Sequence, residues 1–330
     1  MTRAARSRAR LAAALAAGAL LLTACAGQET LQAPTPDAEG ATRAEPTGPT
    51  EVTVSHAQGE TTVPVNPEKV FTFDLATLDT LTELGIEVDG APRASLVRDL
   101  ARYDRDDLVD IGTLFEPDYE VINAEQPDLV IVTSRSAEAL PQLSEIAPTI
   151  DLSVDQTDFR GSVEAAARVL GEIFQVADQV EERIADLDAQ VAAARALTAD
   201  AGTALVVMTS AGEVTAFGPG SRFGFVHDEL GFAPAVADIE VAGHGEAVSF
   251  EFIAQADPDW LVVVDRDAAI GESGAAAQQV LDNELVHATT AWTKGQVVYV
   301  SAADWYVVGG GLGTLSRMTA EITAAIEAAS

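Results

Sequence analysis

The stretch VSFEFIAQADPDWLVVVDR, residues 248–266, decides how this chain folds, because an earlier stretch has the same layout. The earlier stretch, YEVINAEQPDLVIVTSR, covers residues 119–135. In each, a glutamate is followed seven residues later by Pro-Asp and then by an apolar run, and an arginine stands fifteen residues after the glutamate. This layout predicts a short helix, a turn and a parallel strand that is buried on both faces.

The arginines that close the two stretches, Arg135 and Arg266, fall just beyond the carboxyl ends of the predicted strands. Open α/β sheets bind their ligands at this edge. Two matched units therefore imply two similar lobes whose ligand edges face each other. The glutamates, Glu120 and Glu251, share the same offset from Pro-Asp, which favours a pair of docking charges for a two-fold partner over plain exposure to solvent.

The charge of the chain limits its partners. Across 330 residues, 19 Lys and Arg stand against 52 Asp and Glu, for a formal net charge of −33. Such a surface repels the phosphates of nucleic acids and of anionic lipids, so we expect no nucleic-acid partner. Because basic residues are scarce, an arginine at a strand end calls for a specific role.

The N-terminus has the pattern of a secretory signal. Four arginines within residues 3–10 precede an apolar run over residues 11–22, which is too short for a permanent membrane span. The run ends in Leu-Thr-Ala-Cys at Cys25, the only cysteine of the chain, and this ending resembles a bacterial lipobox. We expect a signal peptide over residues 1–24, then a lipidated Cys25 and a disordered tether over residues 25–50. The alternative is a free thiol in a discarded leader.

The rest of the chain alternates predicted strands and helices, which predicts an α/β protein. The predicted division is an N-terminal lobe at residues 51–158, a linking helical segment at 159–199 and a C-terminal lobe at 200–330. In the linking segment, apolar residues recur at spacings of three and four over residues 176–197. A helix of this length spans about 33 Å, so we predict one long linking helix and limited closure of the lobes. Single helices are also predicted over residues 136–146 and 278–285.

Sequence motifs of catalysis are missing. GPGSRFG at residues 218–224 has three residues instead of two between its last glycines, and so differs from a dinucleotide loop. There is no P-loop, no nucleophile elbow and no HExxH motif. The four histidines are too scattered to indicate a metal site. We therefore predict that the chain is not an enzyme.

A third arginine, Arg222, follows a Gly-Pro-Gly turn at the predicted start of a helix. A guanidinium there can bind planar anionic oxygens, and the helix N-terminus adds partial positive charge. A surface salt bridge explains any one arginine equally well, but three at one edge favour an anionic ligand. His244 stands in a Gly-His-Gly loop, where it either lines the cleft or is free at the surface. Trp305 and Tyr306 follow a predicted strand and either line the cleft or cover the core.

Six stretches between residues 52 and 328 resemble the class III ABC-transporter substrate-binding lipoproteins for ferric siderophores, in the branch that takes catecholate-type chelates. They are VFTFDLATLDTLTELGI, VDIGTLFEPDYEVINAEQPDLVIVTSRS, SEIAPTID, AFGPGSRFGFVHDELGF, SFEFIAQADPDWLVVVDR and DWYVVGGG. The resemblance implies two Rossmann-like lobes joined by a single long α-helix, with a shallow ligand cleft between them. It also implies a monomer, lipid-anchored at the extracytoplasmic face of the cell membrane, that captures a ferric siderophore and delivers it to an ABC importer. The N-terminal lipid is the only covalently bound group that it implies.

The resemblance also assigns roles to individual residues. Six side chains match the ligand site of this branch: Arg135, Arg222, Arg266, His244, Tyr306 and the adjacent Trp305. The arginines surround the anionic chelate, and the histidine and tyrosine complete the shell of the ferric ion when the chelator supplies only four donors. Glu120 and Glu251 match glutamates that dock onto arginines of the permease.

Other functions remain as alternatives at this point. One is a binding protein for another iron chelate, such as a hydroxamate siderophore or haem, although haem calls for an iron ligand in a deeper apolar pocket. The three arginines argue against cobalamin as the ligand. A siderophore-processing hydrolase or reductase and a purely structural surface lipoprotein are the other two alternatives.

Overall fold

The computed structural model describes residues 49–239, 245–271 and 276–329. The predicted signal peptide, the lipidated Cys25 and His244 lie outside these residues. Within them, no helix is both long enough and apolar enough to cross a membrane.

The N-terminal part is built on a five-stranded parallel sheet with the order β5-β4-β3-β6-β7. Its strands are β3 (Val70–Thr72), β4 (Gly90–Ala91), β5 (Val109–Asp110), β6 (Leu129–Val132) and β7 (Thr149–Asp151). β3, β6 and β7 are buried along their whole length, which agrees with strands covered on both faces. An antiparallel hairpin of β1 (Glu51–His56) and β2 (Gly59–Pro64) precedes the sheet.

Short helices connect the strands of this first sheet. They are α1 (Leu75–Glu83), η1 (Arg93–Ser95), η2 (Arg98–Tyr103), α2 (Tyr119–Glu125), η3 (Ala137–Ala139), α3 (Leu140–Leu143) and η4 (Gln156–Asp158), where η1 to η4 are 3₁₀-helices. The single helix predicted over residues 136–146 is wrong, because the segment divides into η3 and α3. Pro141, in the first turn of α3, has no N–H to donate to the preceding turn, so an α-helix cannot run through it.

The C-terminal part is built on a mixed sheet with the order β11-β9-β8-β12-β13, and β10 also pairs with β8. Its strands are β8 (Thr203–Ser210), β9 (Glu213–Phe217), β10 (Ala233–Pro234), β11 (Glu246–Val248), β12 (Trp260–Asp265) and β13 (Val297–Tyr299). β8, β12 and β13 run parallel, whereas β9 is antiparallel to both β8 and β11. The parallel strands therefore share one carboxyl edge.

The helices of the C-terminal part include one π-helix, η5. They are α6 (Phe225–Asp228), α7 (Phe250–Ala256), α8 (Arg266–Ala269), α9 (Ala277–Val280), α10 (Glu284–His287), α11 (Thr290–Thr293), η5 (Ala303–Val308) and α12 (Leu312–Ala329). The single helix predicted over residues 278–285 is wrong, because it divides into α9 and α10. Asn283 causes the break, since it is extended and its side chain accepts a hydrogen bond from the backbone N–H of Leu285.

The two matched stretches fold alike, as predicted from their layout. α2 and α7 each end at a residue in the left-handed conformation, and each is followed by Pro-Asp and a buried strand. The aspartate then fastens the unit to its neighbouring strand. Asp128 Oδ2 accepts from the backbone N–H of Lys69 at 2.8 Å, and Asp259 Oδ2 accepts from that of Thr203 at 3.0 Å. Pro-Asp therefore recurs because its carboxylate holds two sheet strands in register.

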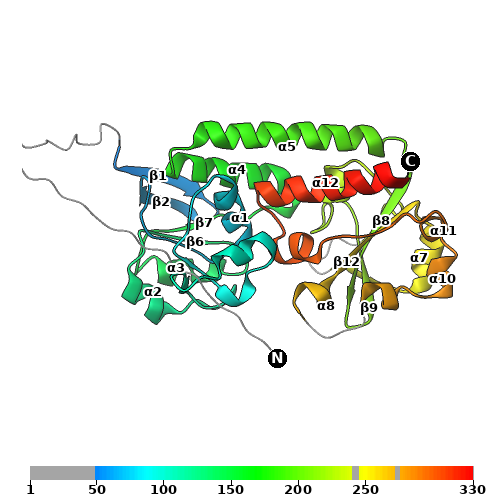
Figure 1. Ribbon diagram of the computed structural model, residues 1–330, viewed down its shortest axis with the longest axis horizontal. Coiled ribbons are helices and arrows are strands. Elements are labelled where there is room, and N and C mark those ends of the chain that lie inside the picture. The colour runs from blue at the N-terminus through cyan, green and yellow to red at the C-terminus, as the bar shows by residue number, and fades with distance from the viewer. Residues whose placement is uncertain (1–48, 240–244, 272–275, 330) are drawn as a thin grey trace, which may run out of the picture. The chain divides into compact units, whose positions relative to one another are not determined.

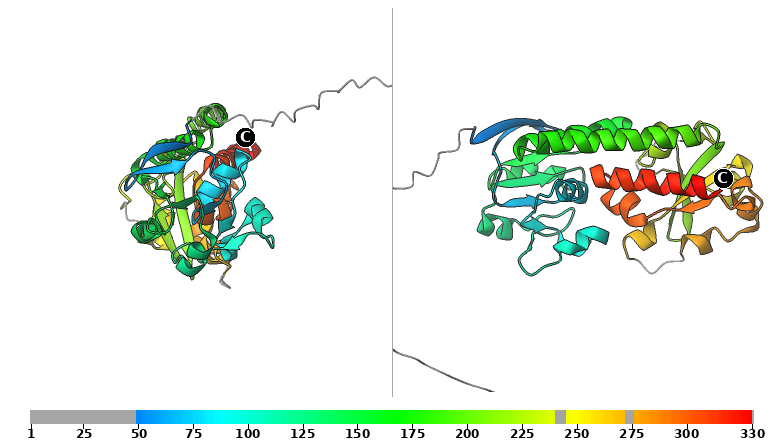
Figure 2. Two further views of the ribbon diagram at one scale, coloured as in Figure 1. Left: turned by 90° about the vertical axis from the view of Figure 1, so that its left-hand side faces the viewer. Right: turned by 45° about the horizontal axis from the view of Figure 1, so that its top comes forward.

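Three helices, α4 (Phe159–Ile173), α5 (Ala177–Thr198) and α12, pack against one another. The 22 residues of α5 span about 33 Å, and Figure 1 shows this helix running from the N-terminal part to the C-terminal part. α12 lies alongside α5 in both views of Figure 2. The apolar stripe of α5 is buried at Val180, Ile184, Leu187 and Val191, as its spacing predicts. Two α/β lobes and one long helix agree with the predicted fold class.

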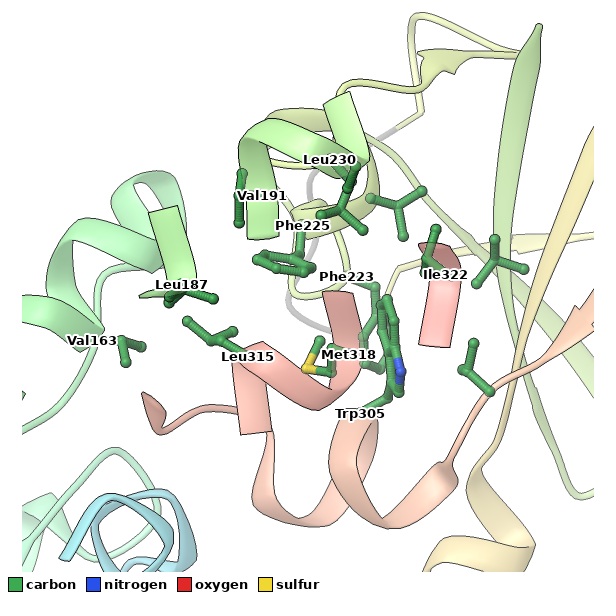
Figure 3. Packing of buried hydrophobic residues seen from close by; sticks show 14 of the residues in the cluster. Val163, Leu187, Val191, Phe223, Phe225, Leu230, Trp305, Leu315, Met318 and Ile322 are labelled. Atoms are coloured by element: carbon green, nitrogen blue, oxygen red, sulfur yellow. The ribbon is translucent and has the colours of Figure 1, made fainter. Parts of the chain in front are cut away.

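A hydrophobic core ties these helices to the second sheet (Figure 3). Trp305 is 1% exposed and lies beside Leu315 and Met318 of α12 in this core. Its ring meets that of Phe225 edge-on, with 6.3 Å between centroids. Its indole N–H donates to Glu321 Oε2 at 2.9 Å. The π-helix that carries Trp305 is therefore fixed firmly to α12.

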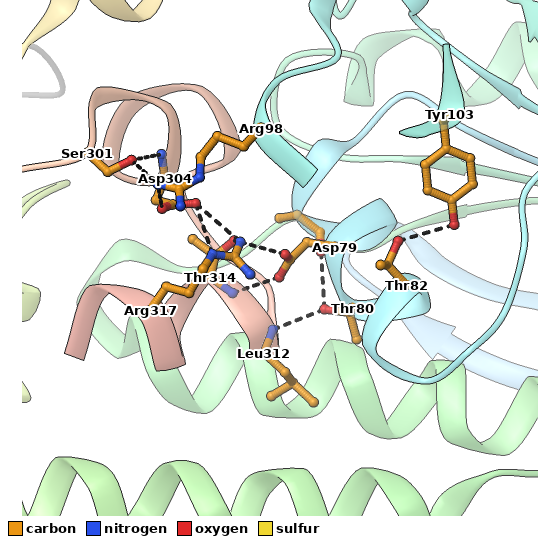
Figure 4. Close-up of polar contacts among 11 residues, drawn as sticks. Asp79, Thr80, Thr82, Arg98, Tyr103, Ser301, Asp304, Leu312, Thr314 and Arg317 are labelled. Carbon is orange, nitrogen blue, oxygen red and sulfur yellow. Dashed lines mark hydrogen bonds and ion pairs between the residues drawn. The ribbon is translucent and has the colours of Figure 1, made fainter. Parts of the chain in front are cut away.

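A polar network joins α1 to the C-terminal elements (Figure 4). Arg317 of α12 pairs with the buried carboxylates of Asp79 and Asp304, at 2.7 and 3.2 Å. Asp79 also accepts from the backbone N–H of Thr314 at 2.7 Å, so α1 supplies a capping group to the first turn of α12. Burial acts to lower the pKa of Arg317, but its bonds to the two aspartates outweigh burial and raise it.

Candidate ligand-binding site

A cavity of about 550 Å³ lies at the carboxyl ends of β6 and β7. Its lining comes from the segments after these strands, from the loop before α6 and from η5. The lining residues are Asp74, Ala76, Thr133, Ser134, Arg135, Leu152, Val154, Gln156, Thr157, Phe159, Gly220, Ser221, Arg222, Trp305, Val308, Gly309, Gly310 and Met318. Segments from both lobes therefore line one cavity. It lies at the carboxyl ends of parallel strands, where the two matched stretches predict the ligand site.

Arg135 reaches from the first lobe to the second. It follows β6 in a tight turn that is closed by a 2.7 Å bond from the Ser136 N–H to the Thr133 carbonyl. Its guanidinium donates from Nη1 to the carbonyl of Val307 at 3.0 Å and from Nη2 to the carbonyl of Tyr306 at 3.2 Å. A side chain from the first sheet is therefore hydrogen-bonded to the π-helix of the second lobe.

Arg222 meets the same carbonyl from the other side. Its loop turns at Gly220, which has a φ of 69° and whose N–H donates to Asp228 Oδ2 at 2.7 Å. Nη2 of Arg222 donates to the carbonyl of Tyr306 at 2.7 Å. Its Cζ also lies 4.3 Å from the centroid of the Tyr306 ring, within cation–π distance.

Arg266 completes the group through the tyrosine hydroxyl. It opens α8 directly after β12, where the side chain of Asp265 caps the helix by accepting from the Ala268 N–H. Nε of Arg266 donates to Tyr306 Oη at 2.9 Å, and Nη1 donates to Ser210 Oγ at 3.1 Å. Tyr306 is thus the common hydrogen-bond partner of all three predicted arginines.

The three arginines bring like charges close together, and Nη1 of Arg266 lies 4.0 Å from Asp267 Oδ1. All three side chains are half-buried. Among the described residues, neither Arg135 nor Arg222 forms an ion pair with a carboxylate, although acidic residues abound in the chain. Burial lowers the pKa of Arg222, and the nearby charges of Arg135 and Arg266 lower it further. The cluster is suited to an anionic ligand, whose oxygens would offset both burial and mutual repulsion.

Trp305 and Tyr306, the two aromatic residues of η5, have different surroundings. Trp305 points into the core, with one edge at the cavity wall, so it both lines the cavity and covers the core. Tyr306 is half-buried among the arginines. The chain leaves η5 through Gly309 and Gly311, both at positive φ, and a Cβ on Gly311 would meet the Ala76 carbonyl oxygen at 2.5 Å. The predicted iron ligand His244 lies outside the described residues.

The sequence predictions did not include the polar side chains on the first-lobe wall. Thr133 and Ser134 come between β6 and Arg135, and Gln156 and Thr157 lie on η4 after β7. Open α/β sheets bind ligands at the carboxyl ends of their strands. These four residues, like Arg135, follow such strand ends, so the same rule could have predicted them. They add hydroxyl and amide groups to the first-lobe wall of the cavity, which also carries the charge of Arg135.

Glu120 and Glu251, the predicted docking residues, are both exposed in the first turns of α2 and α7. Asp118 and Ser249 cap these helices. Hydrogen bonds from its own backbone N–H and from Ser249 lower the pKa of Glu251. Because each helix follows a strand that runs toward the carboxyl edge of its sheet, both glutamates lie toward the edge that carries the cavity.

The chain is similar to several proteins of known binding activity. It is 36% identical over 314 residues to the petrobactin-binding protein YclQ of Bacillus subtilis, covering 94% of this chain and 96% of that protein. It is 33% identical over 279 residues to the ferric-anguibactin-binding protein FatB of Vibrio anguillarum, covering 83% and 87%. These relatives are named as binding proteins, which agrees with the prediction that this chain is not an enzyme.

Solved structures give the same result for the fold. The crystal structure of YclQ superimposes with a TM-score of 0.82 at 38% identity, covering 84% of this chain and 99% of that one. The catecholate-siderophore-binding protein VctP of Vibrio cholerae gives 0.78 at 33% identity, covering 83% and 99%. The family model described as "Periplasmic binding protein" matches residues 70–303. With most of its length matched, this chain belongs to the periplasmic binding protein family.

Proposed function

We propose that the protein captures a ferric siderophore of the catecholate type and delivers it to the permease of an ABC importer. The observation that carries the proposal is the cluster of Arg135, Arg222 and Arg266 around Tyr306, in which Arg135 and Arg222 line the cavity. The named ligands of YclQ, FatB and VctP support it, since all three are siderophore-binding proteins.

The charge of the ligand selects among iron chelates. A ferric tris-catecholate is a trianion with paired oxygens around the metal, and three guanidiniums supply an equal positive charge and planar donors. A ferric trihydroxamate is neutral and would leave the repulsion among the arginines in place. The cavity of about 550 Å³ falls within the range of roughly 300–1,000 Å³ typical of small-molecule sites. The arginines therefore favour an anionic catecholate chelate.

Tyr306 and His244 are proposed to complete the iron shell when the chelator leaves two positions open. Phenolate and imidazole are both suitable ligands for ferric iron. Trp305 is proposed to contact the chelate as part of the cavity lining.

Membrane attachment and docking form the second half of the proposal. Cys25 is proposed to carry the lipid that holds a monomeric protein at the extracytoplasmic face of the cell membrane. Glu120 and Glu251 are proposed to meet arginines of the permease. Their exposure on two similarly folded units supports this, because a two-fold partner requires two similar contacts.

A binding screen tests the proposed ligand class. Purified protein is titrated with a ferric tris-catecholate, a ferric bis-catecholate and a ferric trihydroxamate, and quenching of tryptophan fluorescence is followed, since Trp305 lines the cavity. We expect saturable quenching by the catecholates, weakened by added salt. Binding of the trihydroxamate alone would replace the catecholate assignment, and recovery of a chemically altered chelate would indicate an enzyme.

A further inference from the structure

Phe115 is a large apolar side chain that the fold leaves in water. Its side chain is 64% exposed, more than any other large hydrophobic residue in the described part of the chain. It lies in the loop between β5 and α2, five residues before Glu120. Burying such a side chain is worth about 1.5–3 kcal/mol in general, so a phenylalanine left largely in water at this place favours a partner that covers it.

The loop holds Phe115 outward in a fixed geometry. Gly112 pairs with Pro117 across the loop, and the Thr113 N–H donates to the Glu116 carbonyl at 3.0 Å. The Thr113 hydroxyl accepts from the N–H groups of Phe115 and Glu116 at 3.2 and 2.9 Å. Gly112 has a φ of 113°, and a Cβ there would lie 2.4 Å from the Glu116 carbonyl oxygen. A preformed loop loses little entropy on binding, which favours its use as an anchor.

Three acidic residues follow Phe115 in the sequence, within five positions. Glu116, Asp118 and Glu120 are all exposed, and with Tyr119 they line a shallow groove of about 410 Å³ beside the loop. A partner that fits this surface needs an apolar pocket bordered by lysine or arginine.

The topology indicates which partner meets the loop. β5 runs parallel to the strands whose carboxyl ends border the ligand cavity, so the loop after β5 lies at the same edge. The protein that receives the ligand must approach this edge. The permease is therefore the partner that would meet Phe115, an assignment that rests on the proposed function.

We propose that Phe115 is the apolar anchor of the first lobe on the permease, inserted into an apolar pocket that basic side chains border. At the same offset in the second repeat, the residue five positions before Glu251 is Glu246, so the matched position in the described part of the second lobe holds no aromatic side chain. Each lobe then contributes one glutamate to docking, whereas the first lobe alone contributes the aromatic contact. Phe115 thus sets which lobe contacts which part of the permease.

The test compares Phe115→Ala with Leu197→Ala, which removes an exposed apolar side chain from α5. Each substitution is made in the full-length protein in its own cells, and uptake of radioactive iron from a ferric tris-catecholate is measured. Binding of the same chelate by each purified variant is measured in parallel. We expect Phe115→Ala to lower uptake by about tenfold or more, the scale of an interface hot spot. Chelate affinity and protein level should stay at wild-type values, and Leu197→Ala should change none of these.

Three results would overturn the docking role. Wild-type uptake by Phe115→Ala would exclude an anchor. A loss of chelate affinity in this variant would assign Phe115 to the ligand. A dimer of the purified protein that Phe115→Ala dissociates would place a second copy of the chain on this loop. Failure of the wild-type protein to bind any ferric chelate is a different result, and it would overturn the proposed function and the docking role with it.

Discussion

Replacement of Arg222 by alanine separates a ligand-binding role from a structural one. Arg222 is half-buried and donates to the Tyr306 carbonyl at 2.7 Å. Burial and the charges of Arg135 and Arg266 lower its pKa, so the fold disfavours its charge. The substitution loses one hydrogen bond and a cation–π contact but relieves this electrostatic cost. We expect the free energy of unfolding to change by less than about 1 kcal/mol.

The effect of the same change on ligand binding is expected to be much larger. A hydrogen bond to a charged group contributes about 1.5–3 kcal/mol, so chelate affinity should fall by roughly 10- to 150-fold. The assay is fluorescence titration with a ferric tris-catecholate at two salt concentrations, together with urea unfolding of the ligand-free variant. Arg183→Ala is the matched control, because it removes one exposed positive charge from α5. Unchanged affinity, or a large loss of stability without ligand, would refute the reasoning.

Three further perturbations test other parts of the account. Burial raises the pKa of Glu321, so its favourable contribution is present at low pH and is lost as the pH rises through the folded-state value. Glu321→Gln, which cannot ionise, should lose less stability than the wild type between about pH 4 and about pH 7.5 in urea unfolding; an equal loss in both proteins would contradict this. Cys25→Ala should abolish labelling by radioactive palmitate and release the protein from the membrane fraction; a variant that stays in that fraction would exclude the lipid anchor. Joint substitution of Glu120 and Glu251 by alanine should lower iron uptake without changing chelate affinity, whereas Glu182→Ala on α5 should leave uptake unchanged; normal uptake by the double variant would remove the glutamates from docking.

The main architecture could be predicted because it repeats in the sequence. Within each helix–turn–strand unit the elements follow one another closely along the chain, so local patterns were enough to place Arg135 and Arg266 at strand ends. The spacing of apolar residues gave α5 to within a residue or two. The aspartate of each Pro-Asp has a role that only the structure shows, because its acceptor bonds reach strand residues 59 and 56 positions away.

The arrangement around Tyr306 could not be predicted in the same way. Its carbonyl accepts from Arg135 and Arg222, and this depends on the π-helix turn of η5, which no periodicity announces. The pair of Asp79 and Arg317 joins residues 238 positions apart. In the sequence, Asp79 is one of five polar residues in a nine-residue helix, and nothing sets it apart from the others. Contacts set by the docking of two lobes leave no local pattern in either partner.

The most direct test of the central claim is to locate the iron. Crystals of the protein grown with a ferric tris-catecholate can be measured at the iron absorption edge, and an anomalous difference map then shows the metal position. We predict one peak in the cavity, with chelate oxygens in hydrogen-bond contact with Arg135, Arg222 and Arg266. A peak elsewhere on the protein, or a bound chelate that touches none of the three arginines, would contradict the account.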